Sequence, residues 1–128
     1  MRAETTHQAL RRLLANGPLT ALPVRSADEQ LLLRMAARRF QAQKKYREAE
    51  VNALLRAWLQ TLSAPFGIDH VTLRRRLVDT RLLMRETSGS SYWVDASRLD
   101  DAALDIEPAR VLAEIRDERA ARKRQHAP

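Results

Sequence analysis

Three consecutive arginines, Arg74 to Arg76, are the residues of this chain whose chemistry is most evident. A guanidinium presents several N–H donors in a planar fork, which suits phosphate groups and the edge of guanine. Asp69 precedes them and can accept hydrogen bonds from the unpaired N–H groups of a first helical turn. Leu73 and Leu77 follow at the i, i+4 spacing of a helix, and no Gly or Pro intervenes. The stretch therefore predicts an amphipathic helix that carries the arginines.

Helical geometry predicts different roles for the three arginines. With Leu73 placed at 0°, Arg74 falls at about 100°, inside the apolar arc, and is predicted to be structural. Three carboxylates are candidate partners for its guanidinium: Glu50, Asp79 and Glu86. Thr72, Arg75 and Arg76 fall between about 200° and 300° and are predicted to face solvent or a ligand. By itself, an arginine run more often marks a solvated helix face than a binding site, and the hairpin that follows is what favours a binding site.

A β-hairpin is predicted immediately after this helix. Residues 82–87 and 91–94 are rich in apolar, aromatic and β-branched residues, and Ser88, Gly89 and Ser90 between them suit a turn. Two strands alone are marginally stable, so the hairpin must pack on helices. The order helix, helix, turn, helix, hairpin predicts a mainly α winged helix-turn-helix with a small two-stranded wing. In such folds the second helix of the motif enters the major groove of DNA.

The remaining apolar periodicity predicts four further helices. They cover Thr6–Ala15, Ser26 to about Phe40, about Arg47 to Leu62, and a last helix that begins at Pro108. Ser26 and Glu29 fit a capping box. Trp58 lies in the middle of an apolar stripe and is predicted to anchor the core, while Arg34, Arg38 and Arg39 are predicted to form a solvated flank. The turn at 63–68 is long, and Phe66 or Ile68 is predicted to pack beneath it.

Charge is distributed unevenly along the chain. The net charge is +7, and residues 1–94 hold sixteen basic against eight acidic residues. We therefore expect a winged-helix domain at 1–95, with an N-terminal helix and connector at 1–25 and the core at 26–95. Residues 96–128 are expected to form an acidic linker and a C-terminal helix with a basic end. A surplus of positive charge in the domain suits a phosphate backbone.

The composition argues against other classes of protein. There is no cysteine, and the three histidines lack the spacing of a metal site. Each glycine suits a turn, so no phosphate-binding loop is predicted, and we expect neither catalysis nor a cofactor. No apolar run reaches the length of a membrane span, and no signal peptide opens the chain. These observations predict a cytoplasmic protein without a membrane partner.

Several short motifs follow one another within about residues 7–95: Lys44-Lys45-Tyr46, Glu50-Val51-Asn52, Thr72-Leu73-Arg74-Arg75, Leu82-Leu83-Met84-Arg85 and Tyr92-Trp93. Taken in this order, they resemble the bacterial family called domain of unknown function 2087. The resemblance implies a bacterial protein of winged-helix type that takes part in transcription regulation. Two features depart from the family pattern: Arg47 stands at the usual capping position, and the turn at 63–68 is enlarged.

Two functions follow as hypotheses. The first is DNA binding, with a homodimer on a two-fold site as the expected assembly. The residues expected to contact double-stranded DNA are Thr72, Arg75, Arg76, Lys44, Lys45 and Ser90, and those expected to be structural are Arg74, Glu50, Trp58 and Trp93. The alternative is a winged-helix module that binds a protein and has no intrinsic affinity for DNA, because a fold does not dictate its function.

Overall fold

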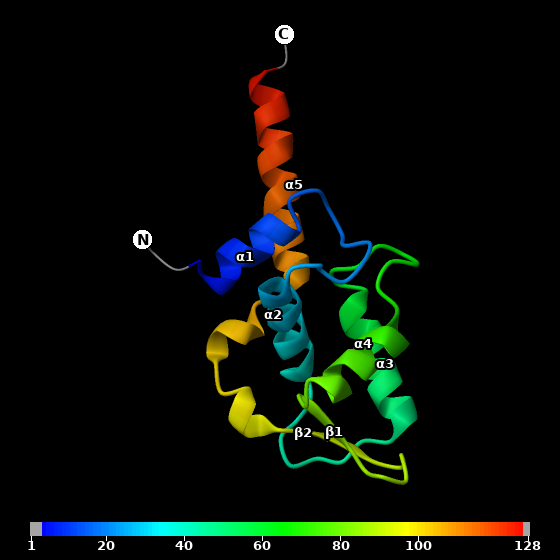
Figure 1. Ribbon diagram of the computed structural model, residues 1–128. Helices are drawn as coiled ribbons and strands as arrows, with labels where there is room; N and C mark the ends of the chain where they lie inside the picture. The colour runs from blue at the N-terminus through cyan, green and yellow to red at the C-terminus, as the bar shows by residue number, and fades with distance from the viewer. Residues whose placement is uncertain (1–3, 127–128) are drawn as a thin grey trace.

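A computed structural model describes residues 4–126 of the chain as a mainly helical protein with one small sheet (Figure 1). Its elements are α1 (Thr6–Leu13), α2 (Ser26–Ala37), α3 (Glu48–Leu59), α4 (His70–Asp79), β1 (Leu83–Arg85), β2 (Tyr92–Val94), two 3₁₀ helices (Ala96–Arg98 and Ala102–Asp105) and α5 (Pro108–Gln125). The five predicted helices and the predicted hairpin are all present. No helix within residues 4–126 combines the length and the apolar character that crossing a membrane requires.

The helices end slightly earlier than the periodicity predicts. The helix predicted to reach Leu62 ends at Leu59, because the chain tightens into i→i+3 hydrogen bonds after it. The amide of Leu62 donates to the carbonyl of Leu59 at 3.1 Å, and the Thr61 hydroxyl donates to the Trp58 carbonyl at 2.6 Å. The apolar residues beyond the helix still reach the core, since Leu62 is buried.

The core lies between α2, α3, α4 and the inner face of the hairpin. α4 packs against both α2 and α3 and is followed directly by β1, which also contacts it. Leu73 and Leu77 of α4 are fully buried, as is Leu55 of α3, and Trp58 is buried as its central position in the stripe predicts. Burial of these side chains fixes which face of α4 is turned outward.

A third segment extends the two-stranded sheet. β1 and β2 are antiparallel, with Leu83 opposite Val94 and Met84 opposite Trp93. Tyr46, just before α3, forms an isolated antiparallel bridge to Tyr92, with N–O distances of 2.7 and 2.8 Å in the two directions. The segment before α3 therefore braces the hairpin through a bridge at one residue, Tyr46.

The acidic connector between β2 and α5 is bound to α2. Arg38 donates to the Asp105 carboxylate at 2.9 Å and to the Leu99 carbonyl at 2.5 Å, and Arg39 pairs with Glu107 at 3.0 Å. Hydrogen bonding to Arg38 lowers the pKa of Asp105. The prediction that these arginines form a solvated flank is therefore wrong: much of their charge is offset within the chain.

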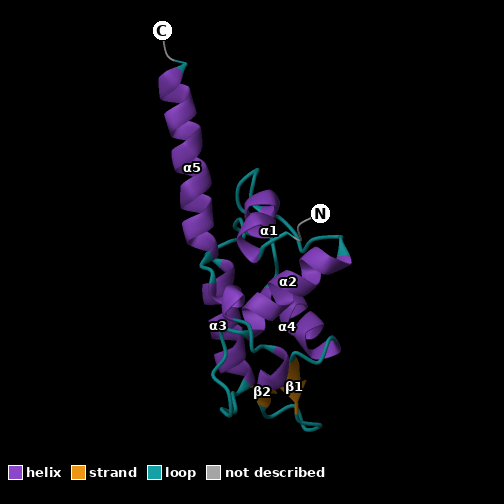
Figure 2. Ribbon diagram, turned by 90° about the vertical axis from the view of Figure 1, so that its left-hand side faces the viewer, coloured by secondary structure: helices purple, strands orange, loops and turns teal. Residues whose placement is uncertain are grey.

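α5 packs on α1 through residues as far along as Glu118, and its C-terminal end projects beyond the other elements (Figure 2). Val111 and Ile115 are buried. His7 of α1 lies 2.9 Å from Glu114, and Arg11 lies 2.5 Å from Glu118. The two terminal helices thus form one packed pair.

Candidate nucleic-acid interface

Asp69 caps α4, as the sequence predicts. Its carboxylate accepts from the backbone N–H and from the hydroxyl of Thr72, both at 3.2 Å. The backbone hydrogen bond is the main cause of the lowered pKa of Asp69. Thr72 is exposed, but its hydroxyl is already engaged in the cap. A ligand at this position would therefore meet the methyl group more readily than the hydroxyl.

Arg74 lies inward, but its partners differ from those predicted. Only 15% of its side chain is exposed, and its guanidinium donates to the Asn52 side-chain oxygen at 2.5 Å and lies 3.5 Å from Glu48. Glu48 and Asn52 are one turn apart on α3 and share a face. Glu50, predicted as a partner, instead accepts from the backbone N–H of Arg47 at 3.0 Å. Glu50 thus stabilises the start of α3, which the sequence leaves without an evident cap.

Arg76 does not face solvent as predicted. It lies 2.6 Å from Glu29 of α2, and 39% of its side chain is exposed. Glu29 makes this contact instead of the predicted capping box, since α2 begins after Arg25 without any side-chain cap. One ion pair between α2 and α4 therefore overturns both predictions.

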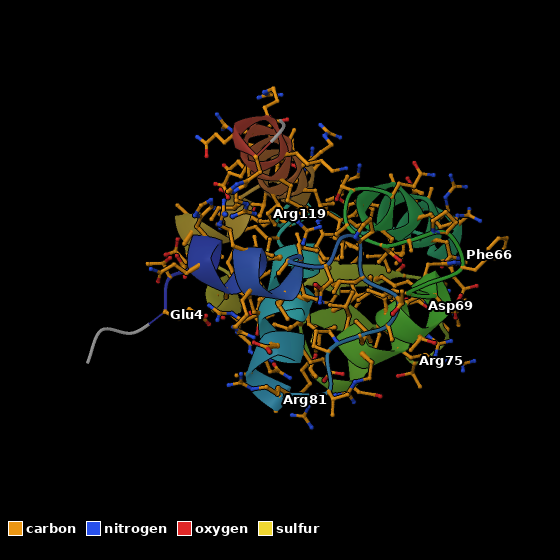
Figure 3. All side chains as sticks on the ribbon, turned by 90° about the horizontal axis from the view of Figure 1, so that it is seen from above. Glu4, Phe66, Asp69, Arg75, Arg81 and Arg119 are labelled. Atoms are coloured by element: carbon orange, nitrogen blue, oxygen red, sulfur yellow. The ribbon has the colours of Figure 1, made fainter. Side chains whose placement is uncertain are left out.

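Of the three consecutive arginines, Arg75 is the one that is exposed to solvent. It is exposed, and within residues 4–126 it makes no ion pair or side-chain hydrogen bond. In Figure 3 its side chain is directed outward, on the side of the molecule that also carries Asp69 and Phe66. Arg81, just after α4, is also exposed and has a positive φ of 62°. Arg75 and Arg81 therefore offer two exposed guanidinium groups to a ligand.

The other predicted contact residues gather around the hairpin. Lys45 lies 3.2 Å from the Glu86 carboxylate, and the Ser90 hydroxyl donates to the same carboxylate at 3.1 Å. These hydrogen bonds lower the pKa of Glu86. Lys44 lies over the ring of Tyr46 at 4.8 Å. Lys45 and Ser90 are therefore brought together by a carboxylate that would compete with a DNA phosphate for both of them.

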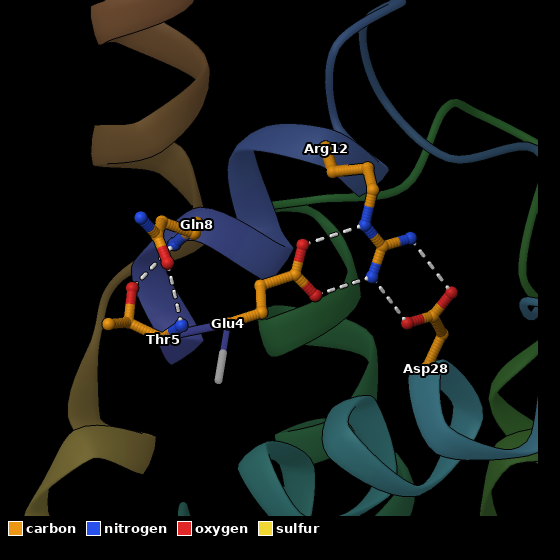
Figure 4. A network of polar contacts seen from close by, with 5 residues as sticks. All are labelled: Glu4, Thr5, Gln8, Arg12 and Asp28. Carbon is orange, nitrogen blue, oxygen red and sulfur yellow. Dashed lines mark hydrogen bonds and ion pairs between the residues drawn. The ribbon is translucent and has the colours of Figure 1, made fainter. Parts of the chain in front are cut away.

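An ion-pair network between α1 and α2, of which Asp28 is the buried member, escapes sequence analysis. Arg12 binds the Glu4 carboxylate through two nitrogens at 2.9 Å and the Asp28 carboxylate at 2.8 and 3.0 Å (Figure 4). Asp28 is buried, and Arg12 lowers its pKa, while both carboxylates raise the pKa of Arg12. Arg12 and Asp28 are sixteen residues apart, and no local motif links them.

The enlarged turn before α4 carries a fully exposed aromatic residue. Phe66 has a φ of 60° and contributes nothing to the core. Ile68 packs against the core, so Ile68 is the residue that packs beneath the turn. Gly67 is needed because a Cβ there would lie 2.7 Å from the Leu19 carbonyl. A hollow of about 700 Å³ lies between α3 and this turn, with Phe66 at its border.

Replacing Phe66 by glycine is expected to raise the free energy of unfolding by about 0.5–1 kcal/mol, because glycine adopts a positive φ without strain and no packing is lost. Gly17 offers the matched control: its φ is +103° and nothing lies near an added Cβ. Gly17→Ala should destabilise the protein through backbone strain alone. Thermal melting measures both changes. A loss of stability in Phe66→Gly would show that the ring makes stabilising contacts.

Fold and geometry define a small, mainly helical protein in which one hairpin follows a helix that displays an arginine. Residues 18–94 match the family described as an uncharacterized protein conserved in bacteria, domain of unknown function 2087, and the chain belongs to this family. Neither the comparison with curated proteins nor that with solved structures finds a match. The matched residues run from the connector before α2 to the end of β2 and exclude α1 and α5.

Proposed function

We propose that this protein binds double-stranded DNA through a winged helix-turn-helix and acts in bacterial transcription regulation. The succession α2, Tyr46 bridge, α3, α4, β1 and β2 supports the proposal, because a winged helix follows that order. In this arrangement α4 is the helix that would enter the major groove, and the hairpin is the wing.

Exposure of Arg75 on the outer side of α4 is the observation that carries the proposal. A guanidinium without an internal partner can donate two hydrogen bonds to O6 and N7 of a guanine. Thr72 lies one turn away on the same side and offers its methyl group to a thymine. Lys44 and Arg81 are exposed and suit phosphates. Arg76 is left out of this contact set, because Glu29 holds it.

The internal ion pairs limit how many phosphates the protein can neutralise. Arg12, Arg38, Arg39 and Arg76 all bind carboxylates of the chain. We therefore expect about two to four phosphate contacts for each protomer, which corresponds to a slope of about −2 to −4 in log K against log [salt]. Fluorescence anisotropy of a labelled duplex at several salt concentrations measures this slope. No complex at low salt would contradict DNA binding.

A homodimer on a two-fold site is the proposed assembly, because one protomer covers few base pairs. Mass measurement of the duplex complex by light scattering distinguishes one protomer from two. A complex with one protomer on every duplex tested would contradict this assembly and leave DNA binding intact.

Phe66 favours a second candidate function, a winged-helix module that holds a protein partner. Phe66 is fully exposed beside a hollow of about 700 Å³, and an exposed aromatic ring next to a hollow offers an apolar anchor to a protein partner. This reading predicts no duplex complex even at low salt. The salt titration therefore separates the two functions in one experiment.

A further inference from the structure

The outer face of the hairpin carries two large apolar side chains where polar ones are usual. Met84 and Trp93 are opposite each other in the sheet and only partly buried, whereas Leu83, Tyr92 and Val94 face the core. A sheet packed on one face alternates apolar inward and polar outward residues. The core does not require Met84 or Trp93 on this face, so their presence calls for another explanation.

These two side chains border a hollow of about 480 Å³ between the hairpin and the loop before α3. Its lining is Gln43, Lys44, Lys45, Met84, Trp93, Val94, Asp95 and Ala96. Its volume lies within the range of small-molecule sites, which combine apolar walls with a few polar groups. The lining fits that description, because an indole, a thioether and small apolar side chains adjoin two ammonium groups.

Charge in the hollow favours an anion. Lys44 is exposed and has no acidic partner within residues 4–126, and the ammonium of Lys45 lies 5.4 Å from the centre of the Trp93 ring. Glu86 offsets part of the charge of Lys45, but Glu86 does not line the hollow. Asp95 does, so the lining holds two ammonium groups and one carboxylate, and the Oδ1 atom of that carboxylate accepts from the hydroxyl of Ser97 at 2.6 Å and from its N–H at 3.3 Å. Lys44 is therefore the charge most available to a ligand.

We propose that this hollow binds a small planar aromatic anion. The aromatic ring stacks on Trp93 and contacts Met84, and the anionic group, a carboxylate or a phosphate monoester, pairs with Lys44. One tryptophan in a single hollow suits one ring, whereas a nucleic-acid strand needs a succession of stacking platforms along a groove. This site shares Lys44 with the proposed DNA contacts, but it lies on the outer face of the hairpin and does not depend on DNA binding.

Two-dimensional ¹H–¹⁵N NMR of the full chain tests the proposal without DNA. Trp93 and Trp58 are the two tryptophans, and the buried Trp58 serves as an internal reference for the indole signals. The probes are 1-naphthoate for the carboxylate source, adenosine monophosphate for the phosphate source, and uncharged 1-naphthamide. We expect the Trp93 indole signal to shift with at least one anionic probe while the Trp58 signal stays in place. The amide should bind at least about tenfold more weakly than naphthoate.

Lys44→Gln should weaken binding of the anionic probe by about tenfold or more. Lys123→Gln, which removes the same charge from the far end of α5, is the matched control and should bind as the wild type does.

Trp93→Leu keeps an apolar side chain on the sheet and should abolish binding, and unchanged amide dispersion would verify its fold. The proposal is overturned by any of three results: no Trp93 shift at millimolar probe, equal affinity for naphthoate and naphthamide, or a single-stranded oligonucleotide that binds here more tightly than either anion. If the wild-type protein does not bind a DNA duplex in a separate titration, that result overturns only the proposed function.

Discussion

Arg75→Ala is expected to weaken duplex binding by about tenfold or more while leaving the melting temperature of the protein unchanged. A bidentate contact from arginine to guanine contributes about 1–3 kcal/mol of discrimination, which corresponds to a tenfold change or more. Arg75 is exposed and contacts no acidic residue of the described chain, so its removal costs little stability. Anisotropy titration of a duplex and thermal melting of the protein measure the two effects.

The neighbouring arginines supply controls of identical chemistry. Arg74→Ala should destabilise the fold by about 1–3 kcal/mol, since it removes a largely buried side chain and its hydrogen bond to Asn52. Arg76→Ala should retain most duplex affinity, because that side chain is held by Glu29 on α2. Equal loss of affinity in the Arg75 and Arg76 variants would contradict this assignment. Unaltered binding in Arg75→Ala would exclude α4 as the interface.

Local periodicity predicted much of the fold correctly, because helices and hairpins depend on near neighbours. The i, i+4 leucines of α4 fixed its buried face, and the cap at Asp69 fixed its start. The same angular argument placed Arg74 inward and Arg75 outward. Those assignments need no knowledge of the rest of the chain, since a helix has one apolar stripe and its other positions follow from the 3.6-residue repeat.

Partners between distant segments could not be predicted in the same way. Glu29 satisfied the spacing of a capping box, yet its carboxylate binds Arg76, which is forty-seven residues away. α2 begins at Ser26 with Arg25 as its N-cap, so Glu29 lies one residue beyond the capping-box position, and the approach of α2 to α4 brings its carboxylate to Arg76. A charged guanidinium at 2.6 Å is the stronger partner for a carboxylate than a terminal N–H.

The net charge of residues 1–94 likewise overestimates how much positive charge is available at the surface. The sixteen basic residues before Asp95 suggest a broad phosphate-binding face, but the acidic connector beyond β2 binds the C-terminal part of α2. The complementary signs of these segments were visible in the sequence. Their contact was not, because two 3₁₀ helices fold the connector back along α2. The charges that remain available for the proposed DNA contacts are fewer and belong to Arg75, Arg81 and Lys44.

Asp28→Ala is expected to lower the free energy of unfolding by about 1–3 kcal/mol, the largest effect among the polar contacts between α1 and α2. Asp28 is 6% exposed and binds two nitrogens of Arg12, and its negative charge in the first turn of α2 also favours the helix. Thermal melting should show a decrease of several degrees.

Glu4→Ala is the matched control, because Glu4 binds the same guanidinium and carries the same charge but is exposed to solvent. Water screens that pair, so the melting temperature should change little.

The effect of Asp28 also depends on pH in a defined direction. Its folded pKa lies below the unfolded value of 3.8, so its contribution is complete above that value and is lost as the pH falls through the folded pKa. The difference in melting temperature between wild type and Asp28→Ala should therefore shrink below about pH 4, and a difference that stays constant there would show that packing, rather than the ion pair, joins α1 to α2.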